Sequence, residues 1–138
     1  MKWKILPHTA DYAFRVYGRD MQELCLNSFQ ALKESMLNKF SVSNQVSQVK
    51  LIKIEAAEPA LLIIDLLREI HYLIVADKIF PIDLKIENLN NSNLRAKLKY
   101  RQLKPEDRII NEVKAITYHA VEIIRKDEVL MIEIVCDV

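Results

Sequence analysis

Two segments of the chain carry apolar residues at the spacing of a helix. The first begins where Asp20 and Glu23 form an acidic version of a capping box, and its periodicity continues to about Lys39. The second opens with Glu58 and Pro59, where a proline in the first turn costs no hydrogen bond. Its apolar residues cover so wide an arc that we expect this helix to be largely buried against a sheet.

The other patterned segments either are rich in β-branched and apolar residues or alternate between apolar and polar residues, as strands do. Alternation is clearest on either side of residues 90–93, which predicts a hairpin with one face in contact with water, and a second hairpin is expected around residues 126–128. The expected strands are Asp11–Gly18, Gln48–Ala56, Ile82–Glu87, Leu94–Arg101, Val113–Arg125 and Val129–Val138. Two helices and about six strands predict a single α+β domain over residues 1–138. We expect a two-layer sandwich with both helices on one face of a mainly antiparallel or mixed sheet.

Composition and charge exclude several classes of protein. Of the 138 residues, 51% are hydrophobic, which is enough for one domain to bury a core without disulfides or a structural metal. Lys and Arg total 20 against 19 for Asp and Glu, so the charge gives no general electrostatic footprint for nucleic acid or membrane. The most apolar stretch, residues 59–76, contains too many charged residues for a membrane span. Cys25 and Cys136 lack redox or zinc spacing and no leader opens the chain, so we expect a reduced, cytoplasmic location.

Acidic residues near the two ends of the chain are the most informative candidates for chemistry. The sequence His-Thr-Ala-Asp at residues 8–11 precedes the first strand, and Asp137 is the penultimate residue. A carboxylate so close to the terminus is unusual in a frayed tail, so both aspartates are expected to face a metal or a protein surface. Plainer interpretations stay open: Asp11 as a turn or capping residue, and Asp137 as part of a solvated strand face with Glu133.

Several groups of residues resemble motifs of the archease family and follow one another in the expected order. They are His8-Thr9-Ala10-Asp11, the helix from Leu61-Leu62 to Leu67, Glu69 and Tyr72, the segment Lys114-Ala115-Ile116-Thr117-Tyr118-His119, and Asp137-Val138. The resemblance implies a small α+β protein that is not an enzyme. It implies an accessory protein that activates the GTP-dependent RNA ligase of tRNA splicing by promoting ligase guanylylation and multiple turnover. Tyr12 and residues 100–102 depart from the usual family pattern, which affects local loop geometry only.

The resemblance also implies the residues of the site. Asp11, Asp137 and a main-chain oxygen at Val138 are expected to bind a divalent cation, commonly calcium, with magnesium or manganese as alternatives. Lys114 matches a functionally important lysine of the family and is expected to contact a partner or a phosphate. The expected partner is the tRNA-splicing RNA ligase, with tRNA or GTP reached through it, and no membrane is expected.

Elementary coordination chemistry agrees with a cation of this kind. Carboxylates and carbonyls are hard oxygen ligands, but two aspartates and one chain-end oxygen are too few to close a calcium shell, so water or a partner must complete it. His8 could orient Asp11 through a hydrogen bond, and a histidine satisfied by the backbone is an equal alternative. Lys114 also has a plain interpretation as a solvated lysine of an exposed strand.

Two further functions remain open. A chaperone-like modulator of another tRNA-processing enzyme, such as a tRNA methyltransferase, is also compatible with the resemblance. A small metal-dependent phosphoesterase would need a general base or nucleophile near the two aspartates, for which His8 is the obvious candidate. Direct contact with RNA has one candidate surface, a basic stripe formed by Arg95, Lys97, Lys99 and Arg101. A hairpin with one face in contact with water explains this stripe more simply.

Overall fold

The computed structural model describes residues 2–6, 11–37, 46–119 and 121–138, with the side chain of Asp11 outside that description. The helices are α1 (Met21–Met36) and α2 (Pro59–Val75). The strands are β1 (Trp3–Leu6), β2 (Asp11–Gly18), β3 (Gln48–Glu55), β4 (Ile79–Leu89), β5 (Asn93–Gln102), β6 (Ala115–Ile116), β7 (Ile123–Lys126) and β8 (Val129–Asp137). Neither of these helices is long and apolar enough to cross a membrane.

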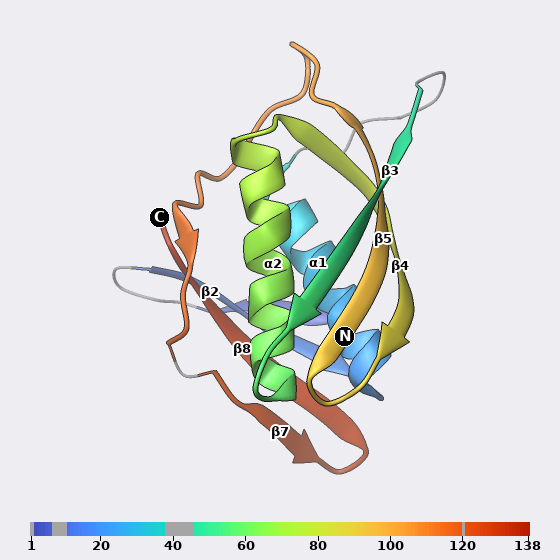
Figure 1. Cartoon of the computed structure of the whole chain (residues 1–138). Helices are drawn as coiled ribbons and strands as arrows, with labels where there is room; N and C mark the ends of the chain where they lie inside the picture. The colour runs from blue at the N-terminus through green and yellow to red at the C-terminus, as the bar shows by residue number, and fades with distance from the viewer. Residues whose placement is uncertain (1, 7–10, 38–45, 120) are drawn as a thin grey trace.

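The described strands form two antiparallel sheets. The larger one has five strands in the order β1-β2-β8-β6, with β7 also paired to β8, and the smaller one has the order β3-β5-β4. Helix α1 packs on β2, β8 and β4, and α2 packs on β3, β4 and β6, so both helices contact both sheets (Figure 1). The expected α+β class with two helices and antiparallel strands is confirmed. The strands are divided between two sheets rather than joined in one as expected, and each helix packs on strands of both.

Local chemistry accounts for the helix boundaries. The side chain of Asp20 accepts a 2.8 Å hydrogen bond from the backbone amide of Glu23, as expected of the N-cap. Helix α1 ends at Met36, short of the expected boundary near residue 39, and residues 38–45 lie outside the description. Helix α2 starts at Pro59 after Glu58, which makes no side-chain cap hydrogen bond.

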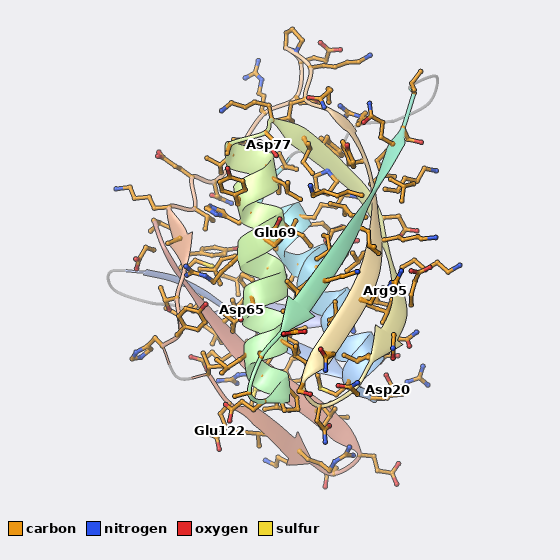
Figure 2. The ribbon with its side chains drawn as sticks, in the orientation of Figure 1. Asp20, Asp65, Glu69, Asp77, Arg95 and Glu122 are labelled. Carbon is orange, nitrogen blue, oxygen red and sulfur yellow. The ribbon has the colours of Figure 1, made fainter. Side chains whose placement is uncertain are left out.

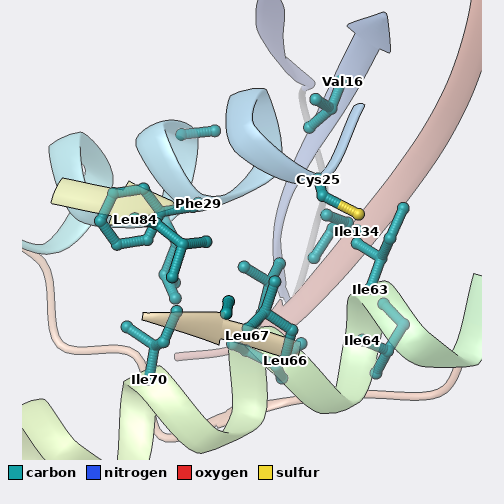
Figure 3. Close-up of a cluster of buried hydrophobic side chains, with 14 of the residues drawn as sticks. Val16, Cys25, Phe29, Ile63, Ile64, Leu66, Leu67, Ile70, Leu84 and Ile134 are labelled. Carbon is teal, nitrogen blue, oxygen red and sulfur yellow. The ribbon is translucent and has the colours of Figure 1, made fainter. Parts of the chain in front are cut away.

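The core is one cluster filled from α1, α2 and the inner faces of both sheets (Figure 3). Strand β5 shows how an alternating sequence directs side chains into this core. Its residues Leu94, Ala96 and Leu98 are at most 2% exposed, while the side chains between them project to solvent. The largest fully buried side chains belong mostly to the two helices: Leu24, Leu32, Met36, Leu62, Ile63, Ile64, Leu66, Leu67, Ile70 and Ile74. The expected burial of the second helix is thereby confirmed.

Three local expectations differ from the structure. The segment Val113–Arg125, expected as one strand, contains two short strands that pair with opposite ends of β8. Strand β1 was not expected, and it forms because the edge of β2 is available to it. Arg101, expected on the wet face of β5, is only 3% exposed and donates hydrogen bonds of 2.6 and 2.9 Å to the carboxylate of Asp107.

Candidate metal site

Asp11 and Asp137 occupy directly opposite positions in the paired strands β2 and β8. Residues at such positions share a face of the sheet, with Cβ atoms about 4.5–5.5 Å apart. The structure thus brings the backbones of Asp11 and Asp137 together across one pair of strands, although the two residues stand far apart in the sequence. Like charges at directly opposite positions are unfavourable in a sheet, and carboxylates are ligands that divalent cations accept.

Strand β6 borders the other edge of β8 at the same level. The backbone amide of Lys114 donates a 2.8 Å hydrogen bond to the carbonyl oxygen of Asp137, and Ala115 lies opposite Asp137. One step along, the amide of Thr117 donates to the carbonyl of Val135 at 2.9 Å. Lys114 therefore lies beside Asp137 through its backbone, while its own side chain is exposed.

Side chains from α2 form hydrogen bonds to backbone carbonyl oxygens on the edge of the β6 segment that faces away from β8. The Nη1 atom of Arg68 donates a 2.6 Å hydrogen bond to the carbonyl oxygen of Ile116, and Nε2 of His71 lies 2.6 Å from the carbonyl oxygen of Val113. A strand of only two residues would be weak alone. Here it is held on one side by β8 and on the other by a helix.

Tyr118 adds a second connection between this segment and α2. Its hydroxyl donates a hydrogen bond to Oδ1 of Asp65, and the guanidinium of Arg68 lies 4.8 Å from the centre of its ring. The hydrogen bond to Asp65 is the main reason that the pKa of Tyr118 is raised, and partial burial adds to the effect. Figure 2 shows Asp65 on α2, on the same helix as Glu69.

Sequence reasoning missed the roles of Asp65 and Arg68. They are two of the charged residues within 59–76 that argue against a membrane span, and the sequence pattern assigned them no other role. Their spacing of three residues places them on one face of a helix, which is the signal that could have paired them. The sequence alone does not show which distant strand this face of the helix contacts.

The neighbouring groups differ in how well they could serve as metal ligands. Burial raises the pKa of the Cys136 thiol to about 12, with a smaller contribution from the adjacent carboxylate of Asp137. A thiol that stays protonated is a poor metal ligand. Asp137 and Val138 are exposed, so their oxygens are accessible. Within the described part of the chain no three His, Cys, Asp or Glu side chains form a group, and His8 lies outside it.

Solved structures share the fold that carries this arrangement. A protein of Methanobacterium thermoautotrophicum, determined in solution, superposes with a TM-score of 0.76 and 25% identity over 99% of this chain and 98% of its own. A crystal structure from Thermotoga maritima, described as an archease and possible chaperone, gives a TM-score of 0.67 and 23% identity over 98% and 96% of the two chains. The class is therefore that of small α+β proteins with this two-sheet fold.

Sequence comparison identifies the family within that class. The sequence model of the archease protein family matches residues 3–138, and the chain belongs to that family. Relatives named protein archease include one from Methanosarcina barkeri, 25% identical over 146 residues that span 99% of this chain and 96% of the relative. Another, from Methanopyrus kandleri, is 28% identical over 141 residues and 99% of both chains. The family resemblance inferred from the motifs is confirmed.

Proposed function

We propose that this archease is a metal-binding accessory protein that activates the GTP-dependent RNA ligase of tRNA splicing. Membership of the archease family supports the proposal, together with the register that sets Asp11 opposite Asp137. That register is the single observation that carries it. A pair of carboxylates across two strands has no evident role in stability, since like charges at opposite positions destabilise a sheet.

Asp11, Asp137 and an oxygen of Val138 are the proposed ligands. Their oxygens suit calcium, magnesium or manganese, and the small number of protein ligands leaves positions for water or for a group of the ligase. A divalent cation at this site would supply positive charge that neutralises a phosphate or a carboxylate of the partner. The backbone around Lys114 holds the carbonyl of Asp137 in the sheet, which fixes the direction of the last two residues.

Lys114 is proposed to contact the partner or a phosphate. Its backbone is fixed to Asp137, while its side chain is exposed and therefore free to reach outward beside the carboxylates. An ammonium group next to a bound cation would make this end of the molecule locally positive. Such an end complements the phosphates of a nucleotide.

The test is a ligation assay with the cognate ligase, GTP, a divalent cation and split tRNA halves, with and without this protein. We expect the protein to increase ligase guanylylation and to convert single turnover into multiple turnover. Asp137→Asn should abolish this stimulation at limiting metal, because half of the carboxylate pair is lost. Glu128→Gln is the matched control, since it removes one exposed carboxylate from the β7–β8 turn and should activate normally.

The alternatives predict different results. Ligase turnover that does not depend on this protein would contradict the proposal, as would full activation by Asp137→Asn at limiting metal. A chaperone-like modulator would instead change the solubility or specificity of another enzyme, such as a tRNA methyltransferase, in the absence of added metal. Hydrolysis of phosphate esters by the protein and metal alone would indicate a phosphoesterase.

A further inference from the structure

The outer face of the three-stranded sheet is a second charged surface, separate from the candidate metal site. It lies on the side away from the helices, as the position of Arg95 relative to α2 illustrates (Figure 2). The side chains of Arg95 and Lys97 are 52% and 51% exposed, and Lys99 follows them on the same face of β5. The residues between them on β5 are buried in the core, so this face can meet only solvent or a partner.

Neighbouring strands place further cations directly opposite those of β5. Lys53 of β3 is paired with Arg95, and Lys85 of β4 is paired with Lys97. Like charges at opposite positions on one face destabilise a sheet. The face therefore carries two cross-strand pairs of like charge, Lys53 with Arg95 and Lys85 with Lys97, which do not favour pairing of the strands.

Nearby carboxylates offset only part of this charge. Glu87 lies 3.2 Å from the ammonium of Lys97 and 3.7 Å from the guanidinium of Arg95. Asp83 lies opposite Lys99, and Glu55 is on the same face at the end of β3. Five cations against three carboxylates leave two net positive charges on this face, whereas the whole chain has a net charge of only +1.

Two cations of this face have neither a carboxylate opposite them nor an ion pair within the part of the chain that the structure describes, whereas Lys99 at least lies opposite Asp83. Lys53 and Lys85 are both exposed, and neither forms an ion pair or hydrogen bond there. Their free ammonium groups flank the central strand on either side. An external anion is the remaining way to compensate them.

The spacing of these cations matches an extended polyanion better than a single small anion. Residues two apart on a strand lie about 6.6 Å from each other, and neighbouring strands lie about 4.8 Å apart. The array is therefore spread over three strands. Lys and Arg at such separations can contact successive phosphates.

We propose that this face, which we call the basic face (Lys53, Lys85, Arg95, Lys97 and Lys99), binds the phosphate backbone of a nucleic acid. The exposed outward positions of the three strands hold no aromatic residue on which a base could stack, since Phe80, opposite Arg101, is buried. Binding is therefore electrostatic and independent of base sequence. It does not depend on the metal site, which lies on the other sheet.

The test is fluorescence anisotropy with a short labelled single-stranded RNA of mixed sequence, and with DNA of the same sequence. Contact with three or four phosphates should lower the affinity by roughly 20- to 50-fold between about 50 and 200 mM salt. Lys85→Gln/Lys97→Gln should weaken binding at low salt by at least about tenfold. The same variant should unfold at about the same temperature, because the loss of the exposed ion pair between Lys97 and Glu87 offsets the removal of the repulsion between Lys85 and Lys97.

Arg125→Gln/Lys126→Gln is the matched control, since it removes the same charge from the exposed end of β7. We expect it to bind like the unsubstituted protein. An equal loss in this control, absence of binding at low salt, or binding that does not change with salt would overturn the proposal. Binding to polyglutamate but to neither oligonucleotide would assign the face to an acidic protein and would also overturn it.

Discussion

The backbone amide of Lys114 donates a hydrogen bond to the carbonyl oxygen of Asp137, with 2.8 Å between the two atoms. This bond joins the short strand β6 to the last residues of the chain. Because Arg68 and His71 bind the other edge of the same segment, the position of α2 is linked to the position of Asp137. The candidate metal site thus depends on residues that do not belong to it.

We expect Arg68→Met to loosen the β6 segment, because the carbonyl of Ile116 loses a charged donor. Hydrogen bonds to charged groups contribute about 1.5–3 kcal/mol when buried, and this one is only partly buried, so a loss of about 1 kcal/mol is expected locally. Hydrogen exchange at the amides of Lys114 and Thr117 should accelerate about fivefold. Calcium affinity, measured by titration calorimetry, should fall as well. Exchange at these amides as slow as in the unsubstituted protein would contradict this role of Arg68.

Asp137→Asn is expected to change stability and metal binding in opposite directions. Without metal, removal of the repulsion across β2 and β8 should raise the free energy of unfolding by about 0.2–1 kcal/mol. Added calcium should raise the unfolding temperature of the unsubstituted protein and leave that of the variant unchanged. Thermal unfolding in chelator and in calcium measures both effects. An equal response to calcium in the two proteins would argue against a site at Asp137.

The buried ion pair of Arg101 and Asp107 is expected to dominate sensitivity to acid. Hydrogen bonds from Arg101 hold the pKa of Asp107 below its usual range, so its stabilising contribution is complete above that range and is lost as the pH falls below it. Asp107→Asn should cost about 3–5 kcal/mol, because Arg101 stays buried without its partner. Urea unfolding at neutral pH measures this cost. Arg101→Met/Asp107→Leu should recover most of the loss, and a double variant as unstable as the single one would contradict this account.

The two buried thiols predict a loss of stability at alkaline pH. Burial raises the pKa of Cys25 and of Cys136 to about 12, from an ordinary value near 9. The unfolded chain therefore releases these protons first, and stability falls by about 1.4 kcal/mol per pH unit for each thiol between about pH 9 and pH 12. Chemical unfolding across this range should show the decline, and Cys25→Ala/Cys136→Ala should lack that part of it. Both thiols should resist alkylation until the protein unfolds.

Gly18 is expected to tolerate no side chain. A Cβ atom at this position would lie 2.5 Å from the backbone nitrogen and 2.8 Å from the Cα of Leu24, in the first turn of α1. Backbone atoms cannot move aside as a flexible side chain does, so Gly18→Ala should destabilise the protein by about 1–3 kcal/mol. Thermal unfolding checks this, and an unchanged unfolding temperature would contradict it.

The sequence by itself determined those features that depend on near neighbours in the chain. Periodicity located both helices, the Asp20 cap and the alternating faces of β5, because each depends on residues a few positions apart. The motifs likewise determined the family, since they are carried by residue identity and order. The candidate ligands Asp11, Asp137 and Val138 stay a prediction that follows from the family resemblance.

The tertiary structure decided which residues that are far apart in the sequence lie next to one another. Only strand pairing sets Asp11 opposite Asp137, and only the packing of α2 against the β6 segment gives Arg68 its contact with Ile116. Burial of Arg101 depends on Asp107 in the following loop, which alternation along one strand cannot reveal. Pairing and packing join residues that are distant in sequence, and their free energies come from contacts that no local pattern contains.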